Sequence, residues 1–172
     1  MLPNRLGGGS GGQPGGSFYP RQVSTISAAI AASLLGASEF TRSLFGEESW
    51  TAEQVVRFVN ERRNATIATV NSGGQPHAAV VIAASVDDAI FFTVAPQSVL
   101  ARNLAGNDRI ALSVCDRSHS VMAQGRGQRV GAAQDLSELI ARLASVTRSG
   151  IFTPDGWDGD IFRVELRRLV AN

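Results

Sequence analysis

The chain has 172 residues, of which 44% are hydrophobic, and its formal net charge at pH 7 is +1. This length accommodates one domain with its own core plus an extension. The composition is not that of a disordered chain or a membrane bundle, and the charge is too small for a surface that coats nucleic acid. We therefore expect a small molecule or a second copy of the chain as partner, and no nucleic acid.

The residue types exclude several kinds of chemistry. All 16 basic residues are arginines, so there is no lysine for a Schiff base with pyridoxal phosphate or for a Walker-type phosphate loop. Cys115 is the only cysteine, and His77 and His119 are the only histidines. An intramolecular disulfide is impossible, and we expect no metal site. The single cysteine fits a reducing compartment, and we predict a cytoplasmic protein.

Two segments precede the predicted domain. Residues 1–23 are predicted to be a flexible leader, because glycine dominates their first part. Residues 24–48 are predicted to be an amphipathic helical arm, since apolar residues recur at helical spacing over 24–45, although Gly36 interrupts the pattern. A secretory signal peptide is the alternative. The uncharged part is shorter than the roughly 20 residues of a membrane span, so we expect the arm to pack on the domain or on a second copy.

Residues 49–172 are predicted to form the compact domain. A capping box from Thr51 to Gln54 starts a helix over 52–63, and a second helix is predicted over 135–148. Short apolar runs separated by turn residues predict strands over 65–70, 77–86, 89–94, 109–114, 120–131 and 160–170. This pattern predicts an α+β fold in which six antiparallel strands form a closed or half-closed barrel rather than a sandwich, with flanking helices and an N-terminal helical extension.

The order of five segments goes further than periodicity. These segments are "ERRNATIATV", "GGQPHAAVV", "IFFTVAPQSVLARNLAGNDRIALSV", "QGRGQRV" and "DIFRVELRRL". Their succession resembles the split β-barrel flavoproteins of the pyridoxamine 5'-phosphate oxidase-like superfamily, in particular the small flavin/deazaflavin oxidoreductases. The resemblance covers about residues 50–170. It implies a homodimer that holds FMN, or the deazaflavin F420, in a groove between the two chains.

The resemblance also implies where the cofactor would lie. Its phosphate-bearing tail would lie at the end of the third strand and the start of the following short helix, which here offer Phe92, Thr93, Gln97, Ser98, Arg102 and Asn103. Its ring would lie along the second strand, at Val80, Val81 and Ile82. Unbonded amides at a helix start favour an anion. An ordinary N-cap is the alternative role for Ser98, and a surface arginine that caps the short helix is the alternative for Arg102.

The sequence departs from the family pattern in its charges. Where family members usually carry lysine, or arginine with lysine, after the serine, this chain has Val99 and Leu100. The charge-assisted hydrogen bonds that such residues give to phosphate are therefore missing, and a protein without cofactor is an alternative. Arg126 and Arg129 could face the groove, with a solvated strand face as the alternative. Trp157 is predicted to contact the substrate, and packing on its own domain is the alternative.

The resemblance implies a flavin-dependent oxidoreductase that transfers hydride between FMN and a small conjugated or aromatic substrate. No residue is identified as a catalytic acid or base, and direct hydride transfer requires none. The alternatives are an F420-dependent reductase of the same fold, a non-catalytic flavin- or haem-binding protein, and an arm that docks the barrel onto a partner. Oxidation of pyridoxamine 5'-phosphate is not expected, because that dianion requires more cationic groups.

Overall fold

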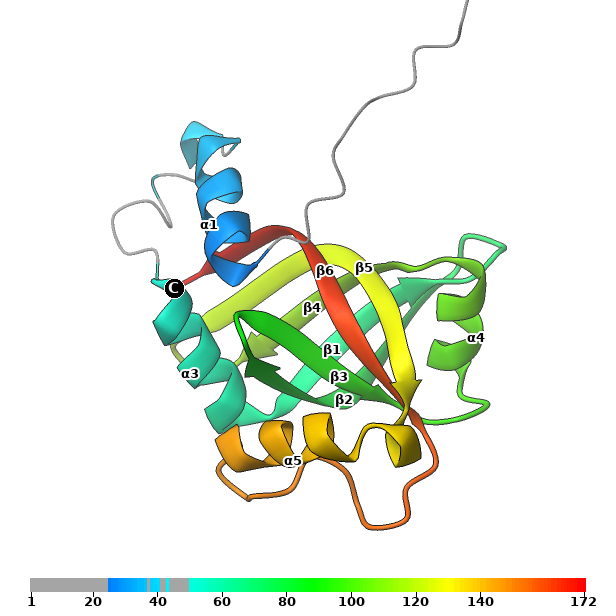
Figure 1. Ribbon diagram of the computed structural model, residues 1–172. Coiled ribbons are helices and arrows are strands. Elements are labelled where there is room, and N and C mark those ends of the chain that lie inside the picture. Colours follow the sequence, from blue (N-terminus) through cyan, green and yellow to red (C-terminus); the bar gives the residue numbers. More distant parts are fainter. Residues whose placement is uncertain (1–24, 37, 41–42, 44–49) are drawn as a thin grey trace, which may run out of the picture.

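The computed structural model describes residues 25–36, 38–40, 43 and 50–172. Six antiparallel strands form a closed barrel in the order β1–β2–β3–β6–β5–β4, with helices around it (Figure 1). The predicted six-stranded antiparallel barrel and α+β class are thereby confirmed. The predicted leader, residues 1–23, lies outside the described residues.

The observed elements follow the predicted order closely. The helices are α1 (Ile26–Leu35), α3 (Ala52–Arg62), α4 (Val99–Gly106) and α5 (Ser137–Val146), with a short 3₁₀ helix η1 (Ala133–Asp135). The strands are β1 (Asn64–Val70), β2 (Pro76–Val86), β3 (Ala89–Val94), β4 (Arg109–Cys115), β5 (Ser120–Ala132) and β6 (Asp160–Ala171). Each predicted strand begins and ends within one residue of the corresponding observed strand. Within the described part of the chain, no helix is long and apolar enough to cross a membrane.

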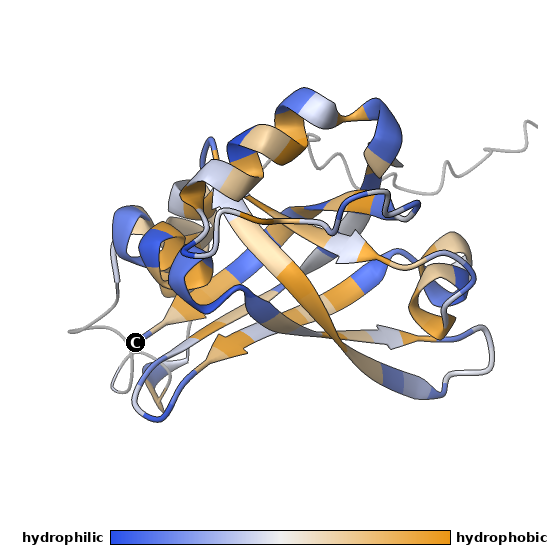
Figure 2. Ribbon diagram, turned by 90° about the horizontal axis from the view of Figure 1, so that it is seen from below, coloured by the Kyte–Doolittle hydropathy of each residue, from blue (hydrophilic) through white to orange (hydrophobic). Residues whose placement is uncertain are grey.

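Hydrophobic residues recur along the strands and helices (Figure 2), and they form two buried clusters, one in the barrel interior and one beneath α5. In β1, for example, Ala65 and Ile67 are buried while Thr66 between them is exposed, as the alternation of a half-buried strand requires. In β3 nearly every residue is buried. Its outer face is covered as well, because α5 and the segment after it pack over β2, β3 and β6 through Leu143 and Phe152.

Helix α3 is fixed at both ends. The predicted capping box is present, since the Gln54 amide N–H donates to the Thr51 hydroxyl at 3.3 Å and the Thr51 N–H donates to Gln54 Oε1 at 2.8 Å. Towards the other end, the buried Asn60 side chain donates to the Ser85 carbonyl at 2.9 Å and accepts from the Ser85 N–H at 2.6 Å. These two bonds attach α3 to β2.

Helix α1 lies over β6 (Figure 1) and packs on the chain's own barrel. Its residues Ile26 and Ala29 are fully buried in the barrel core. The Ser33 hydroxyl accepts a hydrogen bond from the Leu169 N–H of β6 at 2.8 Å. The helix ends at Gly36, so the glycine interruption shortens the helix predicted over 24–45. Residues 24, 37, 41–42 and 44–48 of the predicted arm lie outside the described residues.

Candidate functional site

Strand β2 has one edge that no strand of the described chain covers along half its length. Residues 76–82 pair with β1 on one side, but β3 pairs with β2 only over residues 83–86. At the last step, the Ile82 N–H donates to the Thr93 hydroxyl at 3.3 Å, and that hydroxyl donates to the Ile82 carbonyl at 3.5 Å. Alternate residues of a strand direct their N–H groups to the same side. The N–H groups of Val80 and Ala78 therefore also point away from β1, into the uncovered edge.

Thr93 lies beside this edge and is followed by Val94, the last residue of β3. The connection from β3 to α4 therefore begins close to the uncovered edge. Gln97 has a left-handed backbone conformation, with φ of 58°. Ser98 is the N-cap of α4, and its hydroxyl accepts from the Ala101 N–H at 3.0 Å. The N-cap role considered for Ser98 is therefore present. The remaining first-turn N–H groups of α4 have no partner within the helix, which favours an anion near Ser98.

Helix α4 closes one end of the barrel. Its residues Leu100 and Leu104 enter the core, and the buried Asn103 side chain donates to the Thr69 hydroxyl at 3.0 Å. Arg102 is exposed, and no described residue forms an ion pair with it. Sequence reasoning missed Thr69; its place on the buried side of the alternating strand "ATIATV" is the signal that identifies it.

Of the other residues predicted to contact the cofactor, some lie on the outer side of the barrel wall and others lie in its interior. Val80 is 72% exposed and Ile82 is half-buried towards α5. Val81 and Phe92 are buried in the interior, where Phe92 stacks on Phe162 at a centroid distance of 5.5 Å. The structure thus brings Val80, Ile82, Thr93 and the Ser98 region to the uncovered edge of β2, and keeps Val81, Phe92 and Asn103 inside.

Trp157 packs on its own domain, in the loop that leads into β6. Its ring lies over Gly159 so closely that a Cβ on Gly159 would be 2.2 Å from a ring carbon. The ring also contacts the apolar cluster beneath α5. Because Asp160 pairs with Val94, this loop reaches the end of β3. The predicted contact of Trp157 with substrate stays a prediction.

The two arginines of "QGRGQRV" are neutralised by the chain's own carboxylates. Arg126 pairs with Asp108 at 2.9 Å, and Arg129 pairs with Asp160 at 2.7 Å. The hydrogen bond and charge of Asp160 raise the pKa of Arg129 above its usual value. Within α4 itself, Arg102 is a cation that has no carboxylate partner among the described residues.

A comparison with known protein families shows to which family this chain is related. The sequence profile of the family described as pyridoxamine 5'-phosphate oxidase matches residues 51–160. This span runs from the N-cap of α3 to the first residue of β6, and includes the uncovered β2 edge and the start of α4. The chain belongs to the pyridoxamine 5'-phosphate oxidase family. Helix α1 and most of β6 lie outside the part that matches the family.

Solved structures share the fold of this family member at low sequence identity. A protein of unknown function from Agrobacterium tumefaciens has a TM-score of 0.56 and 21% identity, over 70% of this chain and 56% of that one, so the chain spans little more than half of its length. An F420 reductase has a TM-score of 0.53 and 19% identity, over 65% of this chain and 92% of that one. The haem storage protein HutZ from Vibrio cholerae has a TM-score of 0.52 and 17% identity, over 65% and 87%. No functionally curated protein matches the sequence.

Proposed function

We propose that the chain is a flavin-dependent oxidoreductase that transfers hydride between FMN and a small conjugated or aromatic substrate. The observation that carries the proposal is the uncovered edge of β2, which directs the N–H groups of Ala78 and Val80 beside the start of α4. A flavin ring has hydrogen-bond acceptors along one edge and a phosphate at the end of its side chain. The β2 edge would supply hydrogen-bond donors to the ring, and the start of α4 would suit the phosphate.

The phosphate end of the proposed site would depend on dipoles more than on charge. Ser98 and the first amides of α4 would hold the phosphate, with Arg102 as the exposed cation on the same helix. Leu100 is 3% exposed and points into the core, so that position could not present a basic side chain. Val99 is 41% exposed, and it alone of the two positions could do so. Of the two positions after the serine, only Val99 could therefore have presented a cation to the phosphate.

The ring end requires no acid or base from the protein. When bound, FMN supplies the hydride chemistry itself. The N–H groups of Val80 and Ala78 would orient the ring and favour negative charge on its acceptor edge. Thr93 holds Ile82 in place at the point where the paired ladder ends. The chain's role would thus be to orient the ring.

The uncovered β2 edge and the start of α4 would contact only one side of a flavin, and we propose that a second copy of the chain covers the other side. Val80 on β2 and Val99 at the start of α4 are exposed apolar residues. Association would remove both from water, which is favourable by the hydrophobic effect. Light scattering of the purified chain measures this directly, with a dimer mass expected and a monomer mass contradicting it.

Two other functions are consistent with particular observations. F420 also carries a ring and a phosphate, so the same groove suits an F420-dependent reductase, and one structural neighbour is an F420 reductase. A haem storage protein shares the fold as well. The small number of cations near α4 is the observation that supports a non-catalytic flavin- or haem-binding protein as the second candidate.

The variant Ser98→Asp tests the proposed phosphate position. Aspartate is as good an N-cap as serine, so α4 should keep its stability, while the carboxylate repels a phosphate. We expect the affinity for FMN to fall by about tenfold or more and that for riboflavin, which lacks the phosphate, to stay unchanged. Fluorescence titrations with FMN, riboflavin and F420 and absorbance titration with haemin compare the alternatives. Binding of haemin alone would favour the non-catalytic protein, and equal losses of FMN and riboflavin would contradict the phosphate position.

A further inference from the structure

A bulge in β6 turns two consecutive arginines to the same side of the barrel wall. Gly125 pairs with Leu166 and Gln124 pairs with Arg168, which leaves Arg167 as an extra residue between the two pairs. Leu166 and Leu169 both point into the core, whereas Arg167 and Arg168 between them are exposed. In a regular strand, consecutive side chains point to opposite faces. The bulge therefore keeps one arginine out of the core and places it beside the other.

The facing strand is adapted to this bulge. A Cβ at Gly125 would lie 2.1 Å from the carbonyl oxygen of Glu165, so only glycine allows the two strands to approach as they do. Arg109 of β4 stands on the same outer wall, opposite Arg126 of β5. Arg109, Arg167 and Arg168 together line a cavity of about 480 Å³, and the small residues Ala68, Ala111 and Gly125 also line it.

The three arginines lack the carboxylates that neutralise other arginines on the barrel. Arg126 and Arg129 of β5 each form an ion pair with an aspartate. In the described part of the chain, no carboxylate lies within ion-pair distance of Arg109, Arg167 or Arg168. Three like charges around one cavity repel one another, and an anion that binds there relieves that repulsion.

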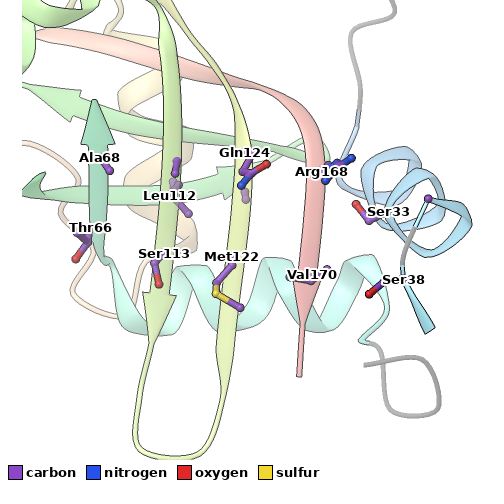
Figure 3. A pocket seen from close by; sticks show the side chains of 13 residues that line it. Ser33, Ser38, Thr66, Ala68, Leu112, Ser113, Met122, Gln124, Arg168 and Val170 are labelled. Carbon is purple, nitrogen blue, oxygen red and sulfur yellow. The ribbon is translucent and has the colours of Figure 1, made fainter. Parts of the chain in front are cut away.

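A second cavity, of about 630 Å³, adjoins the first and shares Ala68, Ala111, Gln124 and Arg168 with it. Figure 3 shows Gln124 and Arg168 side by side at one level of this cavity, and Met122 and Val170 at the next level along the same strands. Met122 is 41% exposed. An apolar surface therefore continues directly from the cationic one.

We propose that Arg109, Arg167 and Arg168 bind the acidic group of a small organic anion, and that its apolar body lies against Met122 and Val170. The site is on the outer wall formed by β1, β4, β5 and β6. The flavin groove proposed above lies along the other edge of β2, so neither proposal requires the other. The ligand class is a carboxylate or phosphate ester with a hydrocarbon or aromatic body.

Three matched probes separate the two halves of this site in the full chain. Decanoate carries both a carboxylate and an apolar body, acetate carries the carboxylate alone, and 1-decanol carries the same hydrocarbon body without charge. Calorimetric titration should show that decanoate binds at least about tenfold more tightly than either of the other two. Decanoate that does not bind, or that binds no more tightly than 1-decanol, would overturn the proposal.

Arginine variants then locate the charge. Arg168→Gln should reduce the affinity for decanoate to near that for 1-decanol, while Arg117→Gln, at an exposed arginine outside both cavities, should leave it unchanged. Equal losses in the two variants would overturn the site. FMN titration of Arg168→Gln distinguishes the proposals, because FMN binding should be unchanged in this variant whether or not decanoate binding is lost.

Discussion

The hydroxyl of Thr93 accepts from the N–H of Ile82 and donates to the carbonyl of the same residue, at 3.3 and 3.5 Å. A side chain here takes the place of the backbone ladder for one step between β3 and β2, and beyond it the β2 edge is uncovered. Thr93→Val removes both bonds and should lower the free energy of unfolding by about 1 kcal/mol, with weaker FMN binding. Thr93→Ser should restore both properties. Urea denaturation and FMN titration measure them, and identical behaviour of the two variants would contradict the role of the hydroxyl.

Val80→Pro tests the proposed contact with the ring. Proline removes the N–H of Val80, which points away from β1, and proline is tolerated at a strand edge where no ladder bond is lost. We expect the fold to persist by circular dichroism, and FMN and riboflavin to lose affinity together. Ser72→Pro, in the turn between β1 and β2, is the matched control, because that turn position accepts proline. A Val80→Pro protein that is folded and binds riboflavin normally would exclude this contact.

Val99→Lys tests the missing charge. A lysine at this exposed position restores a cation beside Ser98, and should raise the affinity for FMN by about tenfold, without changing that for riboflavin. Val146→Lys introduces the same charge at a comparably exposed valine of α5 and should have no such effect. If both variants raised FMN affinity equally, the gain would come from net charge and not from the α4 start.

Ser33→Ala tests whether α1 is part of the fold. This change leaves the Leu169 N–H of β6 without its acceptor in a buried position, and should cost about 1–3 kcal/mol of unfolding free energy. Ser27→Ala on the same helix removes an exposed hydrogen bond to Asp88 and should cost less than about 0.5 kcal/mol. Denaturant titrations compare the two. Equal and negligible effects would mean that α1 contributes nothing to the stability of the barrel.

Asp116 makes the free energy of unfolding depend on pH in the acid range. Hydrogen bonds from the N–H groups of Ser118 and His119, with the charge of Arg62, hold the pKa of Asp116 below its ordinary 3.8. A lowered carboxyl pKa stabilises the folded state above the unfolded pKa, and this contribution is lost as pH falls through the folded pKa. The difference in unfolding free energy between the protein and Asp116→Asn should therefore be constant above about pH 5 and shrink below about pH 4. A difference independent of pH would contradict this.

The strands were predictable because turn residues bound each apolar run, and because inward and outward positions alternate in strands such as β1. In contrast, the sequence "IFFTV" does not show which side of the wall each side chain faces, since α5 covers the outer face of β3 and both faces are buried. Asn103 is a polar residue in a short helix, and its partner Thr69 lies 34 positions earlier in the chain. Nothing local identifies that pair, or the bulge that brings Arg167 beside Arg168.

The extent of α1 was harder to predict than its existence. Apolar residues at helical spacing continue past Gly36, but the helix ends there, at the glycine. The predicted capping box of α3, by contrast, involves residues three positions apart, and such a local motif does not depend on the rest of the fold. The candidate site lies between these cases: the sequence indicated the Ser98 region, while the uncovered β2 edge depends on where β3 stops pairing.

The central claim is that the β2 edge and the α4 start bind FMN. Titrating a fixed amount of FMN with the purified chain, and following FMN fluorescence, tests it most directly. Because a bound ring is held against the protein and loses its contact with bulk water on one face, we predict quenching that saturates at micromolar protein. FMN fluorescence that stays unchanged throughout the titration would contradict the claim.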